Sequence, residues 1–416
     1  MNKPDSSQPV KCRFCANELK HTFVDLGMTP LSNDYIKPEN FERPQSFFPL
    51  SPYVCERCFL VQLPEYESPD SIFKDYAYFS SYSTSWLEHS KAYVQSMLER
   101  FSLGARSHVV EVASNDGYLL QYFKESGVPV LGIEPARNVA AVAEDKGIPT
   151  ISEFFGVELA KRLKAEGREA DLVVGNNVLA HVPDINDFVA GLNIILKPGG
   201  VVTMEFPHLM RLIEGNQFDT IYHEHFSYLS LSTVTEIFAS KGLQLFDVEE
   251  LGTHGGSLRI YAAHASDGAK ETTDRFRELE QREVDFGIRN LETYRVFARE
   301  VHQVKRGLLR MLADLKEQGA RIAGYGAAAK GNTLLSFCGI GTDILDYVVD
   351  RSPHKQGLFL PGTRIPIREP EVLARDKPDY VMILPWNLKP EIMEQLAYIR
   401  EWGGGFIIPI PQAEIC

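Results

Sequence analysis

Short apolar runs alternate with helical stretches through the middle of the chain, and this alternation constrains the fold more than any other feature. The runs are HVVEVAS, VPVLGIE, DLVVGNN and GVVTMEF, between residues 108 and 206. Strands joined by helices in this way predict a parallel sheet. Further on, QLFDVEEL and SLRIYAAH flank Gly255 and Gly256, which predicts an antiparallel hairpin that closes the sheet.

A second alternating unit follows a long charged helical stretch from about Glu271 to Gln318. It contains RIAGYG, ILDYVVD and YVMILPW, which we expect to be strands with helices between them. This pattern predicts a second doubly wound α/β domain. A chain of 416 residues is long enough for two or three domains. We place the boundaries so that an N-terminal module covers 1–70, the first α/β domain 71–267 and the second 268–416.

Four of the six cysteines form two CxxC pairs near the start of the chain, Cys12 with Cys15 and Cys55 with Cys58. The surrounding segment is rich in proline and too small to fold on apolar burial alone. Four thiolates can surround a zinc ion tetrahedrally, and such a closed set leaves no position for a substrate. The pairs therefore predict a structural zinc site.

The charge balance excludes some classes of partner. A net charge of -13 and a pI near 5.4 give no general attraction for nucleic acid or for anionic lipid. No apolar stretch reaches about 18 residues, and the N-terminus lacks an apolar signal core. We expect a cytoplasmic protein, and its charge and complete set of domains are compatible with a monomer.

The stretch VVEVASNDGYLL, residues 109–120, is a candidate cofactor turn. A strand that ends near Glu111 and turns through small residues to Gly117 lets the backbone approach an adenosine closely. Glu134, at the end of the next strand, could accept hydrogen bonds from two ribose hydroxyls. The alternative is a plain tight turn beside an exposed carboxylate. The three-glycine dinucleotide fingerprint is missing, which disfavours a nicotinamide cofactor here.

The stretch IYHEHFSYLS, residues 221–230, is a candidate acid-base site. In an extended segment Tyr222 and Glu224 would face one side, and His223 and His225 the other. A histidine can accept and return a proton at neutral pH. A metal site and a solvated or core-satisfied cluster are the alternatives. His181 follows the strand DLVVGNN, at the edge of the sheet where ligands bind in such folds, although a structural role is the simpler interpretation.

The stretch IAGYGAAAKGNTLL, residues 322–335, is a candidate anion site. A turn through Gly324 and Gly326 leads into a helix whose free amides would face an anion, with Lys330 as a further charge. Asp350 could accept sugar hydroxyls, and Lys355 could bind phosphate. The alternative is a helix start of small residues packed on a sheet.

Together, CRFC, CERC, EVASNDG, NNVLAHV, YHEHFSYLS, HGGSLRIY and GYGAAAKGN give the whole chain a resemblance to the S-adenosylmethionine-dependent C-methyltransferases of nucleotide-linked 4-keto-hexoses. The resemblance implies an α/β protein with three parts in this order. These are a zinc-binding module, a class I methyltransferase domain with a Rossmann-like fold that binds S-adenosylmethionine, and a Rossmann-like C-terminal domain that helps to hold the nucleotide sugar.

The resemblance also implies roles for individual residues. The expected catalytic residues around the sugar are Tyr76, His181, Tyr222, Glu224 and His225. The expected cofactor-binding residues are Glu111, Ala113, Ser114, Asn115, Gly117, Tyr118, Glu134, Pro135, Asn176 and Asn177. The expected substrate-binding residues are Tyr78, Ser81, His254, Ser257, Arg259, Tyr325, Gly326, Lys330, Asn332, Thr333, Asp350 and Lys355.

The expected reaction is methylation of a ring carbon beside the ketone. His225 would remove the proton, with His181 as the alternative base, while Glu224 orients the network and Tyr222 or Tyr76 donates to the enolate oxygen. Two other classes of protein remain possible at this point: a nicotinamide-dependent oxidoreductase or epimerase of nucleotide sugars, and a non-catalytic zinc-stapled binding protein. The sequence leaves the nucleotide base, the sugar configuration and the methylated carbon open.

Overall fold

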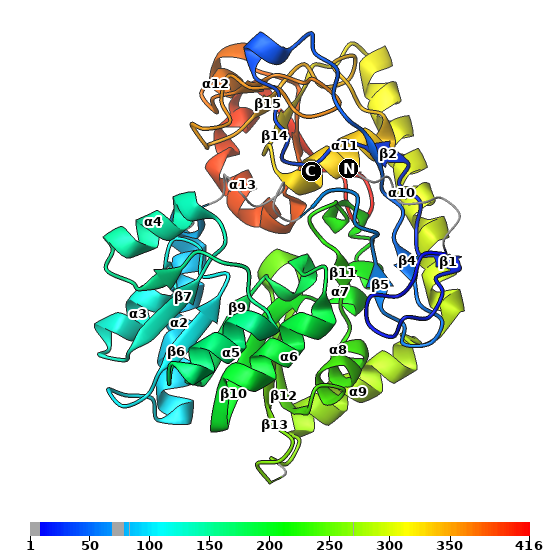
Figure 1. The fold of residues 1–416 in the computed structure, drawn as a ribbon. Helices are drawn as coiled ribbons and strands as arrows, with labels where there is room; N and C mark the ends of the chain where they lie inside the picture. Colours follow the sequence, from blue (N-terminus) through cyan, green and yellow to red (C-terminus); the bar gives the residue numbers. More distant parts are fainter. Residues whose placement is uncertain (1–8, 69–78, 83, 269) are drawn as a thin grey trace. The chain divides into compact units, whose positions relative to one another are not determined.

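A computed structural model describes residues 9–68, 79–82, 84–268 and 270–416 (Figure 1). The chain divides into two compact units, neither of which is continuous in sequence. Unit 1 comprises Met1–Leu19, Cys55–His208 and Phe226–Ile288, and unit 2 comprises Lys20–Val54, Leu209–His225 and Arg289–Cys416. The chain therefore passes from one unit to the other several times, and the two are described separately.

A seven-stranded sheet forms the centre of unit 1, in the order β12-β13-β10-β9-β6-β7-β8. Its strands are β6 (Val109–Val112), β7 (Val130–Ile133), β8 (Thr150–Ile151), β9 (Ala170–Asn176), β10 (Leu196–Pro207), β12 (Leu243–Leu251) and β13 (Ser257–His264). Strands β6 to β10 are parallel, and β13 pairs antiparallel with both β10 and β12. The four predicted strands and the predicted hairpin are confirmed, while the short β8 was not predicted.

Helices cover this sheet, as the blue and green part of Figure 1 shows. They are α2 (Thr84–Phe101), α3 (Leu120–Glu125), α4 (Arg137–Asp145), α5 (Val157–Ala165), α6 (Ile185–Ile195), α8 (Leu231–Ala239) and α9 (Asp274–Phe286). Tyr93 and Met97 of α2 and Phe123 of α3 join one buried apolar cluster with Tyr261 of β13. Because α2 packs on the sheet in this way, the residues just before it lie near the turn after β6.

The cysteine-rich start of the chain is attached to unit 1 by a short strand pair. Strand β5 (Val61–Gln62) pairs antiparallel with β11 (Ser227–Tyr228). The backbone N–H of Leu63 donates to the carbonyl of Phe226 at 3.0 Å, which extends the pairing. The two segments are far apart in sequence, so this pairing fixes the cysteine module to the rest of unit 1.

Unit 2 contains the second predicted α/β sheet, in the order β16-β15-β14-β17-β18-β19. Its strands are β14 (Ile322–Tyr325), β15 (Val348–Val349), β16 (Ile367–Arg368), β17 (Tyr380–Ile383), β18 (Gly405–Ile408) and β19 (Glu414–Ile415), and its helices α11 (Ala329–Cys338), α12 (Val372–Asp376) and α13 (Lys389–Gln395). Strands β15 and β17 flank β14 on opposite sides, both parallel to it. The carboxyl end of β14 is therefore a topological switch point, where ligands bind in open α/β sheets.

The charged stretch predicted as one long helix is two helices in different units. Gly287, in the left-handed conformation, ends α9, and the side chain of Asn290 caps the start of α10 (Leu291–Glu317). The prediction of a continuous helical stretch was wrong because it passed over these two caps.

The segment Lys20–Val54 belongs to unit 2, where β1 (His21–Thr22) pairs with β4 (Tyr53–Val54) and β2 (Met28–Thr29) with β3 (Phe48–Pro49). Phe23 is fully buried and stacks on Phe297 of α10 at 4.7 Å between ring centroids. This burial anchors the segment on the long helix.

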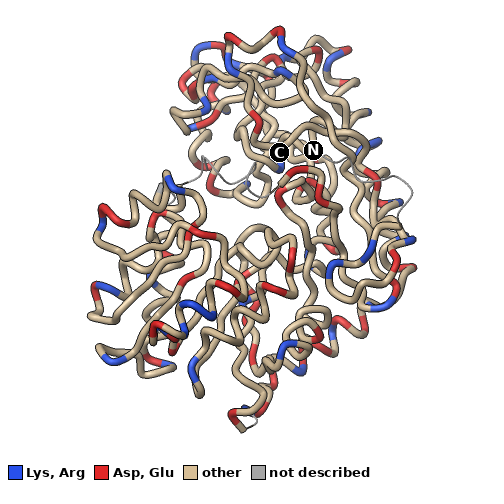
Figure 2. Tube along the Cα trace, in the orientation of Figure 1, with Lys and Arg blue, Asp and Glu red and all other residues tan. Residues whose placement is uncertain are grey.

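Charged residues of both signs are interspersed along each unit, as Figure 2 shows. No helix in the described ranges has the length and apolarity that a bilayer crossing needs. Because the charges are mixed, an anionic ligand would have to be bound by individual cationic side chains or backbone N–H groups.

Candidate active site

The four predicted zinc ligands meet at one point in unit 1. The sulfur atoms of Cys12, Cys15, Cys55 and Cys58 all lie within 4.8 Å of one another. Cys12 Sγ is 3.6 Å from Cys58 Sγ, and Cys15 Sγ is 3.5 Å from Cys55 Sγ. Sulfur atoms around one tetrahedral zinc ion lie roughly 3.8 Å apart, so the donors and their spacing fit zinc.

Each CxxC pair is built on the same local backbone. The residues after the second cysteine, Ala16 and Phe59, both have a positive φ of 58°. The N–H of each donates back to the carbonyl of the first cysteine of its pair, at 2.9 Å. This tight turn directs two thiols to one side, which explains how a loop-rich segment can present four ligands.

Arg13, inside the first CxxC pair, connects the metal centre to the loop that carries His181. Its guanidinium donates to the carbonyls of Pro183 at 2.7 Å and Leu63 at 2.5 Å. In return, Asn186 donates to the carbonyl of Arg13 at 2.8 Å. His181 is the last residue of the short helix η3 (Leu179–His181). The hydrogen bond from Arg13 to Pro183 therefore holds the loop that follows this predicted catalytic residue.

The predicted cofactor turn follows β6. Ala113 and Asn115 have positive φ values of 59° and 49°, and Gly117 has a φ of 75°. A Cβ atom at Gly117 would lie 2.4 Å from Ile148 Cδ1, so the turn requires glycine there. Such a turn brings backbone amides to the carboxyl end of the sheet, where ligands bind.

Buried polar atoms in this turn fit a ligand that supplies hydrogen bonds. Among the residues that the structure describes, Ser114 Oγ, Asp116 Oδ1 and Asn177 Oδ1 are buried with no hydrogen-bond partner. Buried polar groups are rarely left unpaired in native proteins. The unpaired atoms of the turn and of Asn177, at the end of β9, are those that a bound adenosine and methionine moiety could satisfy.

Glu134 lies at the end of β7, as predicted, and is only 6% exposed. Its two carboxylate oxygens accept from the backbone N–H groups of Asn115 at 3.0 Å and Ala136 at 2.9 Å. Burial raises the pKa of Glu134, against the effect of these hydrogen bonds. Each carboxylate oxygen keeps a second lone pair, so acceptance from ribose hydroxyls remains possible.

The other predicted cofactor residues gather around the same turn. Glu111 is fully buried and Tyr118 is 2% exposed, and burial raises the pKa of both well above their usual values. Asn176 is 7% exposed at the end of β9, and Pro135 follows Glu134 directly. Glu111 and Tyr118 therefore belong to the interior of the turn, where burial disfavours their charged forms.

The predicted acid-base segment is a turn and not an extended strand. It follows α7 (Leu209–Glu214) and η4 (Phe218–Thr220), and the N–H of His225 donates to the carbonyl of Tyr222 at 2.9 Å. The rings of Tyr222 and His225 lie 4.0 Å apart as a result. The predicted separation of these two side chains was wrong, because the turn folds the segment back on itself and brings them together.

His225 is oriented by the backbone. Its Nδ1 lies 2.9 Å from the carbonyl oxygen of Thr220. Since a carbonyl can only accept, Nδ1 carries the hydrogen in the neutral ring and Nε2 carries the lone pair. The side chain is 9% exposed, which restricts its access to water. The arrangement prepares Nε2 to accept a proton.

The neighbouring residues have different environments. His223 donates from Nε2 to the carbonyl of Pro49 at 3.1 Å and lies edge-on to Phe48, and burial lowers its pKa to about 4. His223 is therefore a neutral structural residue. Burial raises the pKa of Glu224 to about 7, opposed by a hydrogen bond from Asn33 to Glu224 Oε1. Glu224 can therefore change its charge near neutral pH.

Two residues from the C-terminal part of unit 2 form hydrogen bonds with the residues at the start of this segment. Trp386 Nε1 donates to Asp219 Oδ2 at 2.7 Å, and Thr333 Oγ1 donates to the carbonyl of Ile221 at 3.0 Å. Burial raises the pKa of Asp219 to about 6, an effect that the charge of Lys330 opposes. Burial also lowers the pKa of Lys330. Thr333, predicted to bind substrate, thus contacts the acid-base segment, while Lys330, also predicted to bind substrate, acts on Asp219 just before this segment.

The predicted anion turn after β14 is present, with Gly326 at a φ of 92°. Asp350 accepts from the backbone N–H of Ala327 at 2.7 Å, and Lys355 donates to the carbonyl of Ala327 at 2.8 Å. Asn332 donates to the carbonyl of Ser32 at 2.6 Å. These three predicted substrate residues hold the turn and its surroundings in shape.

Beside the turn, Tyr325 lines an open groove of about 470 Å³ together with Arg351, Gln395 and Tyr398. The groove lies at the switch point of the C-terminal sheet. Its aromatic rings and one guanidinium are the groups that a nucleotide would require.

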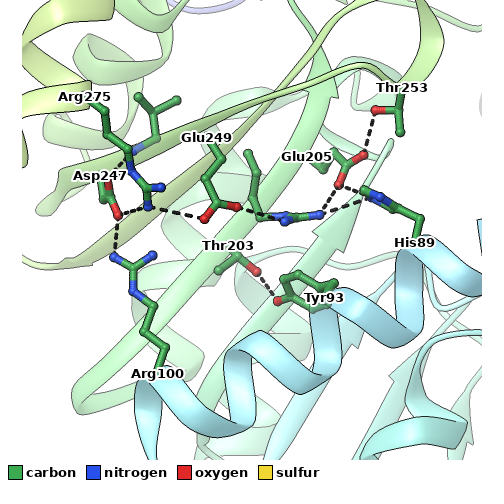
Figure 3. A network of polar contacts seen from close by, with 11 residues as sticks. His89, Tyr93, Arg100, Thr203, Glu205, Asp247, Glu249, Thr253 and Arg275 are labelled. Carbon is green, nitrogen blue, oxygen red and sulfur yellow. Dashed lines mark hydrogen bonds and ion pairs between the residues drawn. The ribbon is translucent and has the colours of Figure 1, made fainter.

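The predicted substrate residues of unit 1 lie in or near a polar network (Figure 3). Arg259 Nη2 pairs with Glu205 Oε2 at 2.8 Å and Nη1 with Glu249 at 3.0 Å. Ser257 is 2% exposed and donates to the carbonyl of Thr253 at 3.0 Å. The guanidinium of Arg259 is thus held by carboxylates of its own sheet, a contact that sequence reasoning missed.

The remaining predicted residues lie around the cofactor turn or outside the described residues. His254 has a φ of 55°, and its Nε2 lies 3.1 Å from Asn177 Nδ2. Ser81 donates to Asp116 of the cofactor turn. Tyr76 and Tyr78 lie outside the described residues, so their roles stay predictions.

Sequence reasoning also missed Asn33, Asp219, Trp386 and Arg13. Asn33 and Trp386 are far from the acid-base segment in sequence and carry no motif of their own. Of these four residues, only Arg13 could have been singled out from the sequence, because it lies between two metal ligands and must be close to the metal. Its hydrogen bonds to the carbonyls of Pro183 and Leu63 could not be predicted.

Comparisons with known proteins identify the family of the chain. Three family models match: "Putative zinc binding domain" over 12–73, "Methyltransferase domain" over 86–248 and "C-methyltransferase C-terminal domain" over 252–411. The chain is 38% identical to C-methyltransferase NovU of Streptomyces niveus over 99% of this chain and 98% of that protein. It is 22% identical to a ubiquinone biosynthesis O-methyltransferase of Coxiella burnetii, over 35% of this chain and 68% of that protein.

Solved structures with a similar fold include the PH0226 protein of Pyrococcus horikoshii, with a TM-score of 0.38, 15% identity and coverage of 48% of this chain and 99% of that one. Another is the magnesium protoporphyrin IX methyltransferase of Synechocystis with bound SAM, with a TM-score of 0.33, 14% identity and coverage of 43% and 79%.

The strand order of unit 1, the four-cysteine centre and the full-length relative lead to one conclusion. The predicted class I methyltransferase fold and the predicted zinc-binding module are confirmed. The chain belongs to the C-methyltransferase family and is a methyltransferase with an N-terminal zinc-binding module and a C-methyltransferase C-terminal domain.

Proposed function

We propose that this enzyme transfers a methyl group from S-adenosylmethionine to a ring carbon beside the ketone of a nucleotide-linked keto-deoxyhexose, as a step of deoxysugar biosynthesis. Its cofactors are S-adenosylmethionine and a structural zinc ion. The observation that carries the proposal is the orientation of His225, whose Nδ1 donates to Thr220 and whose Nε2 therefore holds the lone pair.

A carbon acceptor needs a base of this kind. A ring C–H is not nucleophilic until it loses its proton, and the adjacent ketone makes that loss possible by taking the negative charge onto its oxygen. His225 Nε2 accepts the proton and becomes an imidazolium. Tyr222, whose ring lies 4.0 Å from that of His225, is placed to donate to the enolate oxygen.

Glu224 completes the acid-base group. With a pKa of about 7, its carboxylate can pair with the imidazolium once the proton has moved. His181 remains the alternative base, supported by the loop that Arg13 braces.

The methyl donor binds at the turn after β6. Ser114, Asp116 and Asn177 offer their buried polar atoms, and Glu134 offers acceptor lone pairs for the ribose. S-adenosylmethionine supplies an electrophilic methyl group on a positively charged sulfur.

The nucleotide sugar binds to the C-terminal domain, at the groove lined by Tyr325, Arg351 and Tyr398. Arg351 can pair with a phosphate, and the two tyrosines can stack on a base. A nicotinamide-dependent oxidoreductase has no comparable support, because the turn after β6 lacks the three-glycine fingerprint.

The experiment is a screen of dTDP-, GDP- and other nucleotide-linked keto-sugars with S-adenosylmethionine labelled with ¹³C in the methyl group. We expect one class of keto-sugar to gain the label, with the chemical shift of a C–CH₃ carbon and proton–carbon correlations from the labelled methyl group to the sugar ring. A label with the chemical shift of an O-methyl or N-methyl group, or no label in any nucleotide sugar, would exclude the proposed reaction.

A further inference from the structure

Asn33 contacts the acid-base segment although it lies between the two cysteine pairs in sequence. Its Nδ2 is 2.5 Å from Glu224 Oε1, and both residues belong to unit 2. Glu224 is 6% exposed, whereas Asn33 is exposed. An ionised carboxylate can only accept, so the amide group of Asn33 is the donor.

The turn that carries Asn33 is fixed on both sides. The N–H of Asp34 donates to the carbonyl of Leu31 at 3.1 Å, which closes the turn around Asn33. The carbonyl of Ser32 accepts from Asn332 at 2.6 Å, and the hydroxyl of Tyr35 donates to the carbonyl of Ala327 at 2.5 Å. Ser32 and Tyr35, on the two sides of Asn33, are thus attached to Asn332 of α11 and to Ala327 just before this helix, which positions the turn that carries the amide.

The hydrogen bond from Asn33 affects the pKa of Glu224. Burial dominates the pKa of Glu224 and raises it, and the hydrogen bond from Asn33 opposes that effect. Tyr35, on the N-terminal segment, stays neutral because burial raises its pKa, and the negative charge of Glu224 raises it further. His225 and Tyr222 belong to the same turn as Glu224. Asp350 and Lys355 lie beyond Tyr35, in contact with Ala327.

We propose that Asn33 is a positioning residue for methyl transfer, which holds Glu224 Oε1 and so fixes the orientation of that carboxylate in the acid-base segment. This inference rests on the proposed function for its kinetic part. Without the amide, the carboxylate would lose its donor in a buried site, and the protonated form would become more favourable.

Three variants separate the amide from the side-chain volume. Asn33→Ala removes the donor, and Asn33→Asp keeps the shape but replaces the donor by an acceptor. Asn33→Ser keeps a shorter donor. Asn40→Ala, on the same segment, is the matched control. Circular dichroism and thermal unfolding establish that each variant is folded, and Asn33→Asp is the variant to use if the alanine variant is not.

The first readout is independent of turnover. A difference infrared titration reports the protonated carboxyl of Glu224, and the band missing in Glu224→Gln identifies it. We expect the pKa of Glu224 to rise by about one in Asn33→Ala and further in Asn33→Asp, and to change little in Asn33→Ser and Asn40→Ala. An unchanged pKa in both Asn33→Ala and Asn33→Asp would overturn the inference.

The second readout is kinetic. At pH 7 we expect kcat of Asn33→Ala to fall about tenfold with little change of KM for the nucleotide sugar, and to recover as the pH rises and Glu224 ionises again. A fall that does not depend on pH, or a change of KM alone, would contradict a positioning role. If the wild type itself methylates no nucleotide keto-sugar, the proposed function fails, while the infrared titration still decides whether Asn33 acts on Glu224.

Discussion

The Nδ1 atom of His225 donates a hydrogen bond to the carbonyl oxygen of Thr220, 2.9 Å away. A backbone group therefore orients the imidazole. The position of that carbonyl depends on η4, which Asp219 and Trp386 attach to the C-terminal domain. The placement of His225 therefore depends on the buried contact between Asp219 and Trp386.

Lys330 provides the first prediction, because its surroundings indicate a counter-ion for Asp219 more than a phosphate ligand. Lys330→Met would leave Asp219 buried without its nearest cation, so we expect a loss of about 3 kcal/mol in the free energy of unfolding, measured with urea. The double variant with Asp219→Asn should regain most of this loss. A phosphate ligand would behave differently, with unchanged stability and a higher KM for the nucleotide sugar.

Arg13 should stabilise the loop of His181 without affecting the metal. Arg13→Met removes hydrogen bonds to two carbonyls, of Pro183 and Leu63, and we expect a cost of about 3 kcal/mol in unfolding free energy with a normal zinc content by mass spectrometry. Arg57→Met, at an exposed position of the second CxxC pair, is the control and should change neither quantity. Zinc loss in Arg13→Met would mean that the residue serves the metal site instead.

Gly117 tests the cofactor turn. Gly117→Ala adds a Cβ 2.4 Å from Ile148 Cδ1 at a φ of 75°, whereas Gly127→Ala has a similar φ of 74° and no atom within 4 Å. We expect Gly127→Ala to cost about 1 kcal/mol in unfolding free energy with normal binding of S-adenosylhomocysteine by calorimetry. Gly117→Ala should cost more and weaken that binding at least tenfold. Equal behaviour of the two variants would argue against a close cofactor turn.

Asp247 makes the network of Figure 3 sensitive to acid. Burial raises its pKa, but hydrogen bonds from Arg275, Thr273 and Arg100 outweigh this effect and bring the pKa to about 2. A lowered pKa stabilises the fold above the unfolded value of about 3.9, and the contribution is lost as the pH falls toward 2.

Between pH 5 and pH 2, the wild type should therefore lose about 1 kcal/mol more unfolding free energy than Asp247→Asn, since partly exposed arginines are screened by solvent. The exposed Asp343→Asn serves as the control and should follow the wild type. The same acid dependence in Asp247→Asn and the wild type would show that the network contributes nothing.

Periodicity was sufficient to predict both sheets, because alternating apolar runs and Gly-rich turns are local signals. The two CxxC pairs were equally informative, since metal chemistry restricts what four thiols can do. Local signals failed for the segment around His225, where alternation suggested a strand and a single hydrogen bond between His225 and Tyr222 makes a turn.

Contacts between distant segments could not be predicted in this way. The loop between the cysteine pairs joins unit 2 because Phe23 packs on α10, and this places Asn33 against Glu224. Nothing in the sequence near Asn33 indicates such a partner. The same holds for Arg259, which the resemblance assigns to substrate binding and whose guanidinium pairs with Glu205 and Glu249 of its own sheet.

The central claim is that His225 removes the proton beside the ketone, and exchange of that proton with solvent tests it most directly. In D₂O with S-adenosylhomocysteine bound, no methyl group can be transferred, so exchange at the acceptor carbon reports the base alone. His225→Asn keeps a donor in the place of Nδ1 and removes Nε2. His223→Gln, which keeps a donor toward Pro49, is the matched control. We predict that the wild type and His223→Gln exchange the proton and that His225→Asn does so at least 100-fold more slowly, within the range expected for loss of a general base. Exchange at the wild-type rate in His225→Asn would contradict the account.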